Sequence, residues 1–197
     1  MATNARGPLG GFIARVFAWL PVTFVAWYFA APALVWPAAL IVELVARLAL
    51  ADIVEGIEQV RSVLTFVTTL KPGSTSTQDA QVTVDVDLLL YSFGLPLYAA
   101  LVLAAKLPGW PRRLILGYAA LMPFVAWGAL ADFLKNVAIS SGPQIASQTG
   151  FIAWQREVIA FSYQFGALIL PTVAPVVAWV LTHRAFLERL RLKPAAD

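Results

Sequence analysis

Four long apolar stretches constrain this chain more than any other feature of its sequence. They run from about residue 12 to 35, 88 to 105, 114 to 134 and 158 to 181. A transmembrane helix needs roughly 20 mostly apolar residues, and only 13% of the 197 residues are charged, about half the share of a soluble domain. The sequence therefore predicts one integral membrane domain over residues 1–197, an all-α bundle of about four transmembrane helices. It excludes an ordinary soluble protein and a disordered chain.

The few charged residues are sorted along the chain. The N-terminal segment, the loop 106–113 and the C-terminal tail carry nine Lys or Arg and two acids, whereas the other segments carry five and nine. Cytoplasmic loops of membrane proteins are enriched in Lys and Arg, so we predict a multi-pass protein of a bacterial inner membrane with both termini in the cytoplasm. No basic patch points to nucleic acid, and the expected partners are membrane lipids and another membrane protein.

The first apolar stretch has two interpretations. Arg6 and Arg15 precede it and a small-residue stretch surrounds Pro32, as in a signal peptide. The stretch is long, however, contains Trp19 and Trp27, and has a proline inside the small-residue site. We therefore predict an uncleaved first span.

The segment 36–87 is the longest one between the predicted spans, and it falls on the periplasmic side. Pro37 can open a helix, and apolar residues recur at helical spacing from Ala38 to about Val60, with Glu43 and Arg47 one turn apart. We predict an amphipathic helix at the outer interface. A fifth span, tilted or re-entrant, is the alternative.

The second half of the same segment alternates between apolar and polar residues. The alternation covers residues 63–69 and 82–88, and the polar, turn-rich sequence 71–79 separates them. Period two with β-branched residues is typical of strands, so we predict a small periplasmic β-hairpin that leads into the second span. An isolated hairpin is marginal in water, so the interfacial helix or another protein must cover it.

Few side chains near the predicted spans can carry chemistry. Asp132 and Lys135 lie near the outer end of the third span, at a spacing that predicts an ion pair. Glu43 and Arg47 predict a second pair, with contact to a substrate or partner as the alternative. Tyr163 and Gln164 enter the fourth span, where they can hydrogen-bond to other helices.

The inventory of reactive groups argues against an enzyme. The chain has no Cys and one His, His183, which lies at the predicted cytoplasmic end of the fourth span. A dyad of Lys135 with Ser140 or Ser141 has nothing in the flanking loop to align it, and no phosphate-binding glycine loop or serine elbow occurs. We expect no catalytic residues, no cofactor and no metal site.

The most distinctive stretch of the chain is residues 15–32. A Trp-Leu-Pro sequence opens the first span, Trp-Tyr follows, and Ala-Pro closes the stretch. This pattern resembles the exosortase H-associated membrane proteins, small integral membrane proteins of Gram-negative bacteria. The matching residues, which we interpret as a recognition or packing face, are Trp19, Leu20, Pro21, Trp27, Tyr28 and Pro32.

The resemblance implies a role beside an exosortase, a membrane cysteine transpeptidase that processes proteins bearing a C-terminal sorting signal. Without Cys, this chain cannot be that enzyme. The leading hypothesis is a non-enzymatic accessory subunit that holds the exosortase or its substrate at the periplasmic membrane face. The alternative is a small transporter or lipid-handling subunit, suggested by Pro171 and Pro175, which should kink the fourth span.

Overall fold

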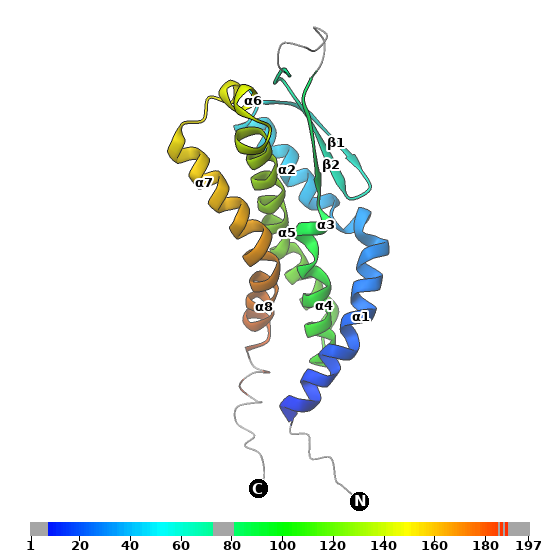
Figure 1. Cartoon of the computed structure of the whole chain (residues 1–197). Coiled ribbons are helices and arrows are strands. Elements are labelled where there is room, and N and C mark those ends of the chain that lie inside the picture. Colours follow the sequence, from blue (N-terminus) through cyan, green and yellow to red (C-terminus); the bar gives the residue numbers. More distant parts are fainter. Residues whose placement is uncertain (1–7, 73–80, 185, 187, 189–197) are drawn as a thin grey trace, which may run out of the picture. The chain divides into compact units, whose positions relative to one another are not determined.

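The computed structural model describes residues 8–72, 81–184, 186 and 188 (Figure 1). The chain is mostly helical, with one small antiparallel sheet. Its elements are α1 (Pro8–Leu34), α2 (Trp36–Ala49), β1 (Val54–Val60), β2 (Val63–Thr68), β3 (Thr83–Asp87), α3 (Leu89–Ser92), α4 (Gly94–Ala104), α5 (Trp110–Lys135), the π-helical turn η1 (Asn136–Ser140), α6 (Pro143–Gln148), α7 (Ala153–Gln164), the π-helical turn η2 (Phe165–Ile169) and α8 (Leu170–Thr182). Parts of the predicted linker and of the basic termini, including Arg6, Arg189, Arg191 and Lys193, lie outside the described residues.

Three helical segments among the described residues are long and apolar enough to cross a membrane. They are Leu9–Leu34, Trp110–Ser140 and Ala153–Thr182. The second predicted span corresponds to the shorter apolar stretch Leu89–Ala104, which a turn at Phe93 divides into α3 and α4. Three candidate spans are therefore shown, and a bundle of four stays a prediction.

The chain divides into two compact units. Unit 1 comprises Met1–Ala30, Phe93–Leu121 and Thr172–Asp197, and unit 2 comprises Ala31–Ser92 and Met122–Pro171. Unit 2 thus contains α2, the whole sheet and the segment from η1 to η2.

The amphipathic helix predicted from residue 38 to about 60 is too long. The helix α2 ends at Ala49, and residues 54–60 form the strand β1 instead. The prediction was wrong because Ile53 and Ile57 also fit a helical face, whereas in the fold Ile57 pairs with Phe66 of β2. Backbone pairing with β2 is a tertiary interaction, and it overrides a local helical pattern.

The predicted hairpin is part of a three-stranded antiparallel sheet of order β1–β2–β3. The strands β2 and β3 coincide with the predicted ones, in a register that sets Phe66 opposite Val84 and Leu64 opposite Val86. A register shift between Val54 and Gly56 marks a bulge in β1. The third strand gives the sheet the minimum size for independent stability.

One face of the sheet is buried within unit 2. Leu64, Phe66 and Val86 have no exposed surface. The Phe66 ring stacks on the ring of Phe133 from α5, with centroids 4.2 Å apart and planes inclined by 13°. The surface that the hairpin was predicted to need is therefore supplied by α5 of the same chain.

Two glycines let elements of unit 2 approach α5 closely. A Cβ atom on Gly128 would lie 2.3 Å from Cδ1 of Tyr91, and one on Gly166 would lie 3.1 Å from Cα of Gly128. Gly166 lies in η2, where the N–H of Leu170 donates to the carbonyl of Phe165. This wider turn ends two residues before Pro171, and the kink predicted from Pro171 and Pro175 stays a prediction.

Unit 1 is held by side chains that reach between distant parts of the sequence. The Arg15 Nε atom donates to the carbonyl of Ala104 at 2.9 Å, and the Phe12 ring stacks on Trp179 with centroids 5.3 Å apart. The Tyr98 hydroxyl donates to the carbonyl of Arg113 at 2.7 Å, and its ring occupies the space that a side chain at Gly117 would need.

Candidate functional site

A small polar cluster lies on α5 in unit 2. Asp132 is 8% exposed, and its Oδ1 atom is 3.1 Å from Nζ of Lys135. The Lys135 ammonium also lies over the ring of Tyr163, 4.3 Å from its centroid. Asn136 donates from Nδ2 to Oδ1 of Asp132 at 3.1 Å, and Tyr91 of α3 lies near the same carboxylate. The structure thus brings together three residues singled out from the sequence, Asp132, Lys135 and Tyr163.

The charged and polar groups of this cluster interact with one another. The carboxylate of Asp132 has a cation and the amide donor of Asn136 beside it, and Lys135 has a carboxylate and an aromatic face. A buried carboxylate must have such partners. The arrangement is that of an ion pair within α5, with Asn136 and Tyr163 of α7 beside it.

We expect the substitution Asp132→Asn to lower the free energy of unfolding by about 2 kcal/mol. The amide oxygen still accepts a hydrogen bond from Asn136, but the partly buried Lys135 loses its counterion. Equilibrium unfolding of the purified protein in mixed micelles measures the change.

The matched comparison removes both charges. The double variant Asp132→Asn/Lys135→Met should recover most of the loss, because an apolar side chain of similar length leaves no unpaired charge. A double variant less stable than Asp132→Asn would show that the ammonium stabilises this unit for a reason other than its pairing with Asp132.

Glu43 and Arg47 form the predicted ion pair along one turn of α2. Three quarters of the Arg47 side chain is exposed, so the pair is worth little stability. Both residues line a polar cavity of about 240 Å³ between α2 and β1, together with Glu55 and Gly56. The structure does not place this pair among the partners of Asp132 described above.

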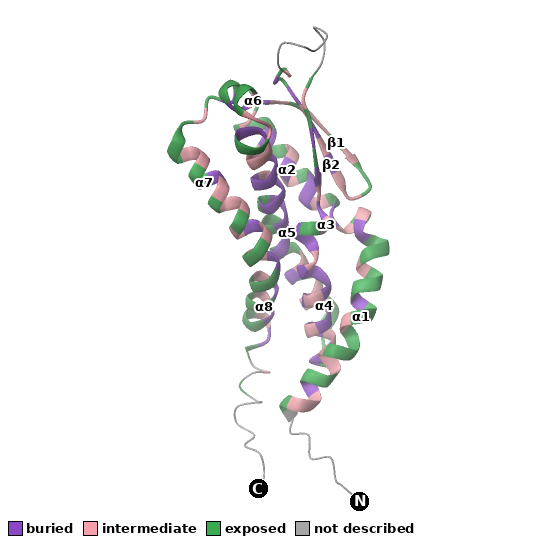
Figure 2. Ribbon diagram, in the orientation of Figure 1, coloured by how far each residue is buried: buried purple, intermediate pink, exposed green. Residues whose placement is uncertain are grey.

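The distinctive residues of the first span lie along α1, and they do not form a packed face. Tyr28 is 62% exposed and Pro21 is also exposed, whereas Leu20, Trp27 and Pro32 are intermediate. Trp19 is exposed, and its carbonyl accepts a hydrogen bond from the buried Thr23 hydroxyl. Figure 2 colours most of α1 as exposed. In the most apolar stretch of this helix 11% of the residues are buried, whereas the share is 44% in the segment that contains α5. The helix therefore offers apolar surface to lipid or to another helix.

Gln164, a candidate polar contact, and His183, the one histidine of the chain, are not part of the polar cluster. Gln164 is exposed at the end of α7. His183 is buried in unit 1, stacks on Trp179 and has Nδ1 3.1 Å from the carbonyl of that residue. Burial, assisted by the nearby charge of Arg113, lowers the pKa of the imidazole, so His183 is neutral at pH 7.

A largely apolar groove was not foreseen from the sequence. It has a volume of about 450 Å³ and lies between α2, α5 and α7, with Ile41, Leu130 and Val158 among its lining residues. Each helix contributes apolar residues that also fit an ordinary membrane-facing surface. The only hint in the sequence was that the apolar residues of 38–49 follow a helical face.

The comparisons with known proteins agree with the resemblance noted for residues 15–32. No curated protein and no solved structure gave a match to the chain. The model of one protein family, described as exosortase H-associated membrane protein, matches residues 6–186. This match includes all three candidate spans and the sheet. The chain therefore belongs to the exosortase H-associated membrane protein family.

Proposed function

We propose that this protein is a non-enzymatic accessory subunit of exosortase H, which it holds, with or without its substrate, at the periplasmic face of the inner membrane. The family name points to association with that membrane protein. The acid and the base that the structure brings together, Asp132 and Lys135, neutralise each other. A binding role is therefore better supported than a catalytic one.

The observation that carries the proposal is the free edge of β3. Thr68 donates its N–H to the carbonyl of Val82, and Leu88 donates to Ser62. In an antiparallel ladder, alternate residues bond to the same neighbour, so the backbone groups of Thr83 and Asp85 face away from β2. No described residue pairs with these groups. An extended segment of a partner can add to such an edge by main-chain hydrogen bonds.

The exposed surface of α1 supports the same proposal inside the membrane. Phe17, Pro21, Phe24 and Tyr28 recur at helical spacing, and all four are exposed. A transmembrane helix of the exosortase can pack along this stripe, while the sheet edge engages a periplasmic segment.

The test is co-purification of tagged protein with co-expressed exosortase H in mild detergent. We expect the wild-type chain to retain the exosortase and Thr83→Pro to reduce its recovery about tenfold. Proline removes the outward N–H and obstructs an added strand, and such a loss corresponds to one or two backbone hydrogen bonds. Proline is tolerated at the first residue of an edge strand, so the sheet itself should remain folded.

Thr83→Ala is the matched control, because it removes the side chain but keeps the N–H. It should retain the exosortase at the wild-type level, and both variants should share the thermal stability of the wild type. If the wild-type chain retains no exosortase, the proposed association is wrong. If both variants retain it equally well, the edge of β3 is not the binding surface.

A further inference from the structure

The groove of unit 2 has walls suited to a hydrocarbon chain. It lies between α2, α5 and α7, and its lining includes Ile41, Val45, Leu130, Val158 and Ile159. Apart from the Ser162 hydroxyl and the Trp127 indole, the lining side chains are hydrocarbon. About 450 Å³ is within the range of small-molecule sites. Such a groove favours an extended apolar ligand over a polar one.

A cation that has no counterion among the described residues lies one helical turn before a residue that lines the groove. Arg156 precedes Ile159 by three residues on α7, so the two share a face of the helix. Its Nε atom is buried and has no hydrogen-bond partner. Its Nη2 atom reaches only the carbonyl of Ala146, at 3.4 Å. Among the described residues no carboxylate lies within ion-pairing distance of this guanidinium.

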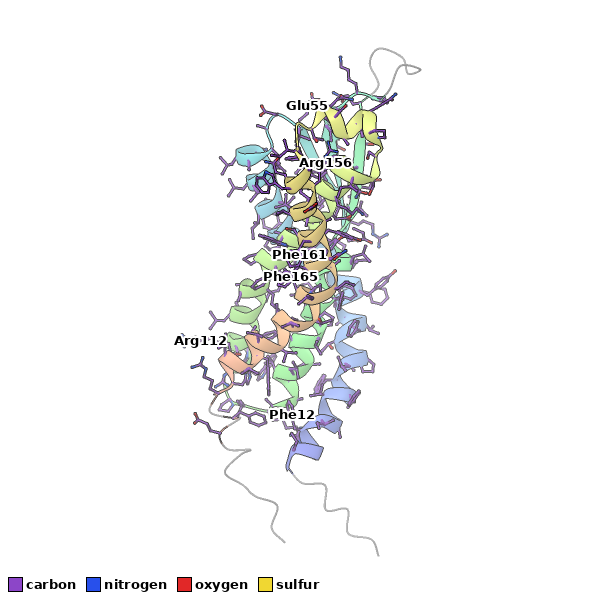
Figure 3. The ribbon with its side chains drawn as sticks, turned by 60° about the vertical axis from the view of Figure 1, so that its left-hand side comes forward. Phe12, Glu55, Arg112, Arg156, Phe161 and Phe165 are labelled. Atoms are coloured by element: carbon purple, nitrogen blue, oxygen red, sulfur yellow. The ribbon has the colours of Figure 1, made fainter. Side chains whose placement is uncertain are left out.

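A half-buried guanidinium in this state has an unused capacity to bind an anion. The carbonyl of Ala146 does not depend on it, because Thr149 donates to the same oxygen at 2.8 Å. Arg presents a planar fork of donors that matches phosphate. Figure 3 shows Arg156 near the start of α7, with Phe161 further along α7 and Phe165 at the start of η2.

The length of this helix places Arg156 at the level of lipid headgroups. The apolar helical segment Ala153–Thr182 has 30 residues, which gives a length of about 45 Å. A bilayer with its headgroup regions is about 40–45 Å thick. Arg156 lies within the first turn of this segment, and Trp154, which is 60% exposed, lies beside it in the sequence, as in an interfacial aromatic belt. Val158 and Ile159 follow toward the hydrocarbon.

We infer that this groove binds an anionic phospholipid, with its phosphate on Arg156 and an acyl chain along α2, α5 and α7. Arg156 selects the charge of the headgroup, and the groove holds the chain. The site shares no residue with the edge of β3 or with the exposed stripe of α1, so it does not depend on the association with exosortase H.

Spin-labelled lipids test the site in nanodiscs of phosphatidylcholine that contain the full-length protein. We expect more spin-labelled phosphatidylglycerol than spin-labelled phosphatidylcholine to be motionally restricted. Arg156→Gln should reduce this headgroup preference about fivefold, as expected for one basic residue at an anionic surface. Arg156→Lys keeps the charge and should retain most of the preference.

The groove has its own variant and matched control. Val158→Trp should fill the groove and reduce restriction of both lipids, because Val158 lines it and is 51% exposed. Val173→Trp makes the same change at an exposed site of α8 outside the groove and should behave as wild type. The inference is overturned if wild type shows no headgroup preference, if Gln and Lys at position 156 behave alike, or if Val158→Trp matches Val173→Trp. If the helix of a partner protein, and not a lipid, is the natural occupant of the groove, Val158→Trp and Val173→Trp should behave alike.

Discussion

Replacing Phe66 with alanine is expected to lower the free energy of unfolding by about 4 kcal/mol. The Phe66 and Phe133 rings are fully buried and stack 4.2 Å apart, so the substitution leaves a cavity between the sheet and α5 and removes an aromatic pair. Equilibrium unfolding in mixed micelles measures the loss, and amide hydrogen exchange should show that the strands become less protected.

Phe161→Ala is the matched control for this prediction. Phe161 lies on α7 and is 67% exposed (Figure 3), although its ring stacks on Phe165. Its removal should cost less than about 1 kcal/mol, because little buried area is lost. Equal losses in the two variants would contradict the conclusion that the sheet is anchored on α5 through Phe66.

Gly128→Leu should destabilise unit 2 by about 3 kcal/mol. Even a Cβ atom at this position would lie 2.3 Å from Cδ1, 2.7 Å from Cγ and 3.1 Å from Cβ of Tyr91. These atoms are near the Tyr91 backbone, so a simple rotation of the ring does not clear the space. The thermal unfolding temperature in detergent should fall.

A substitution to leucine at an exposed position of the same helix serves as the control. Ala120 is exposed on α5, so Ala120→Leu should change stability by less than about 0.5 kcal/mol. A Gly128→Leu protein as stable as Ala120→Leu would mean that α3 does not pack against α5 as described. The smaller substitution Gly128→Ala should give an intermediate loss.

The long apolar helices were predictable because they depend on local properties of the chain. Bilayer thickness sets a length, and an apolar run of that length can be read directly from residues 12–35, 114–134 and 158–181. The segment Leu89–Ala104 shows the limit of this reasoning. Its composition suits a span, but the turn at Phe93 shortens the continuous helix, and composition does not reveal that turn.

The strand β1 could not be predicted because two periodicities overlap in residues 50–60. Apolar residues there fit a helical face as well as a strand, and the bulge between Val54 and Gly56 breaks the alternation. Pairing with β2, which follows after a turn at Arg61 with φ of +58°, decides between them. Arg61 in a left-handed conformation is not a usual turn signal.

The contacts of the candidate site are also of two kinds, local and long-range. The spacings of Asp132 with Lys135 and of Glu43 with Arg47 are local, so both ion pairs could be inferred from the helix alone. The approach of Tyr91 to Asp132, of Tyr163 to Lys135 and of Phe66 to Phe133 joins elements that are far apart in the sequence. The sequence contains no periodicity that relates such positions.

The amino-acid order alone thus pointed to a membrane protein, its long helices and two of its strands. Each of these depends on composition or on spacing within a few residues, where the physics is the transfer of apolar groups out of water and the geometry of one helix or strand. Packing decided the rest: the third strand, the anchoring of the sheet on Phe133, and the apolar groove between α2, α5 and α7. These features depend on which residues meet across the fold, and only the folded chain brings them together.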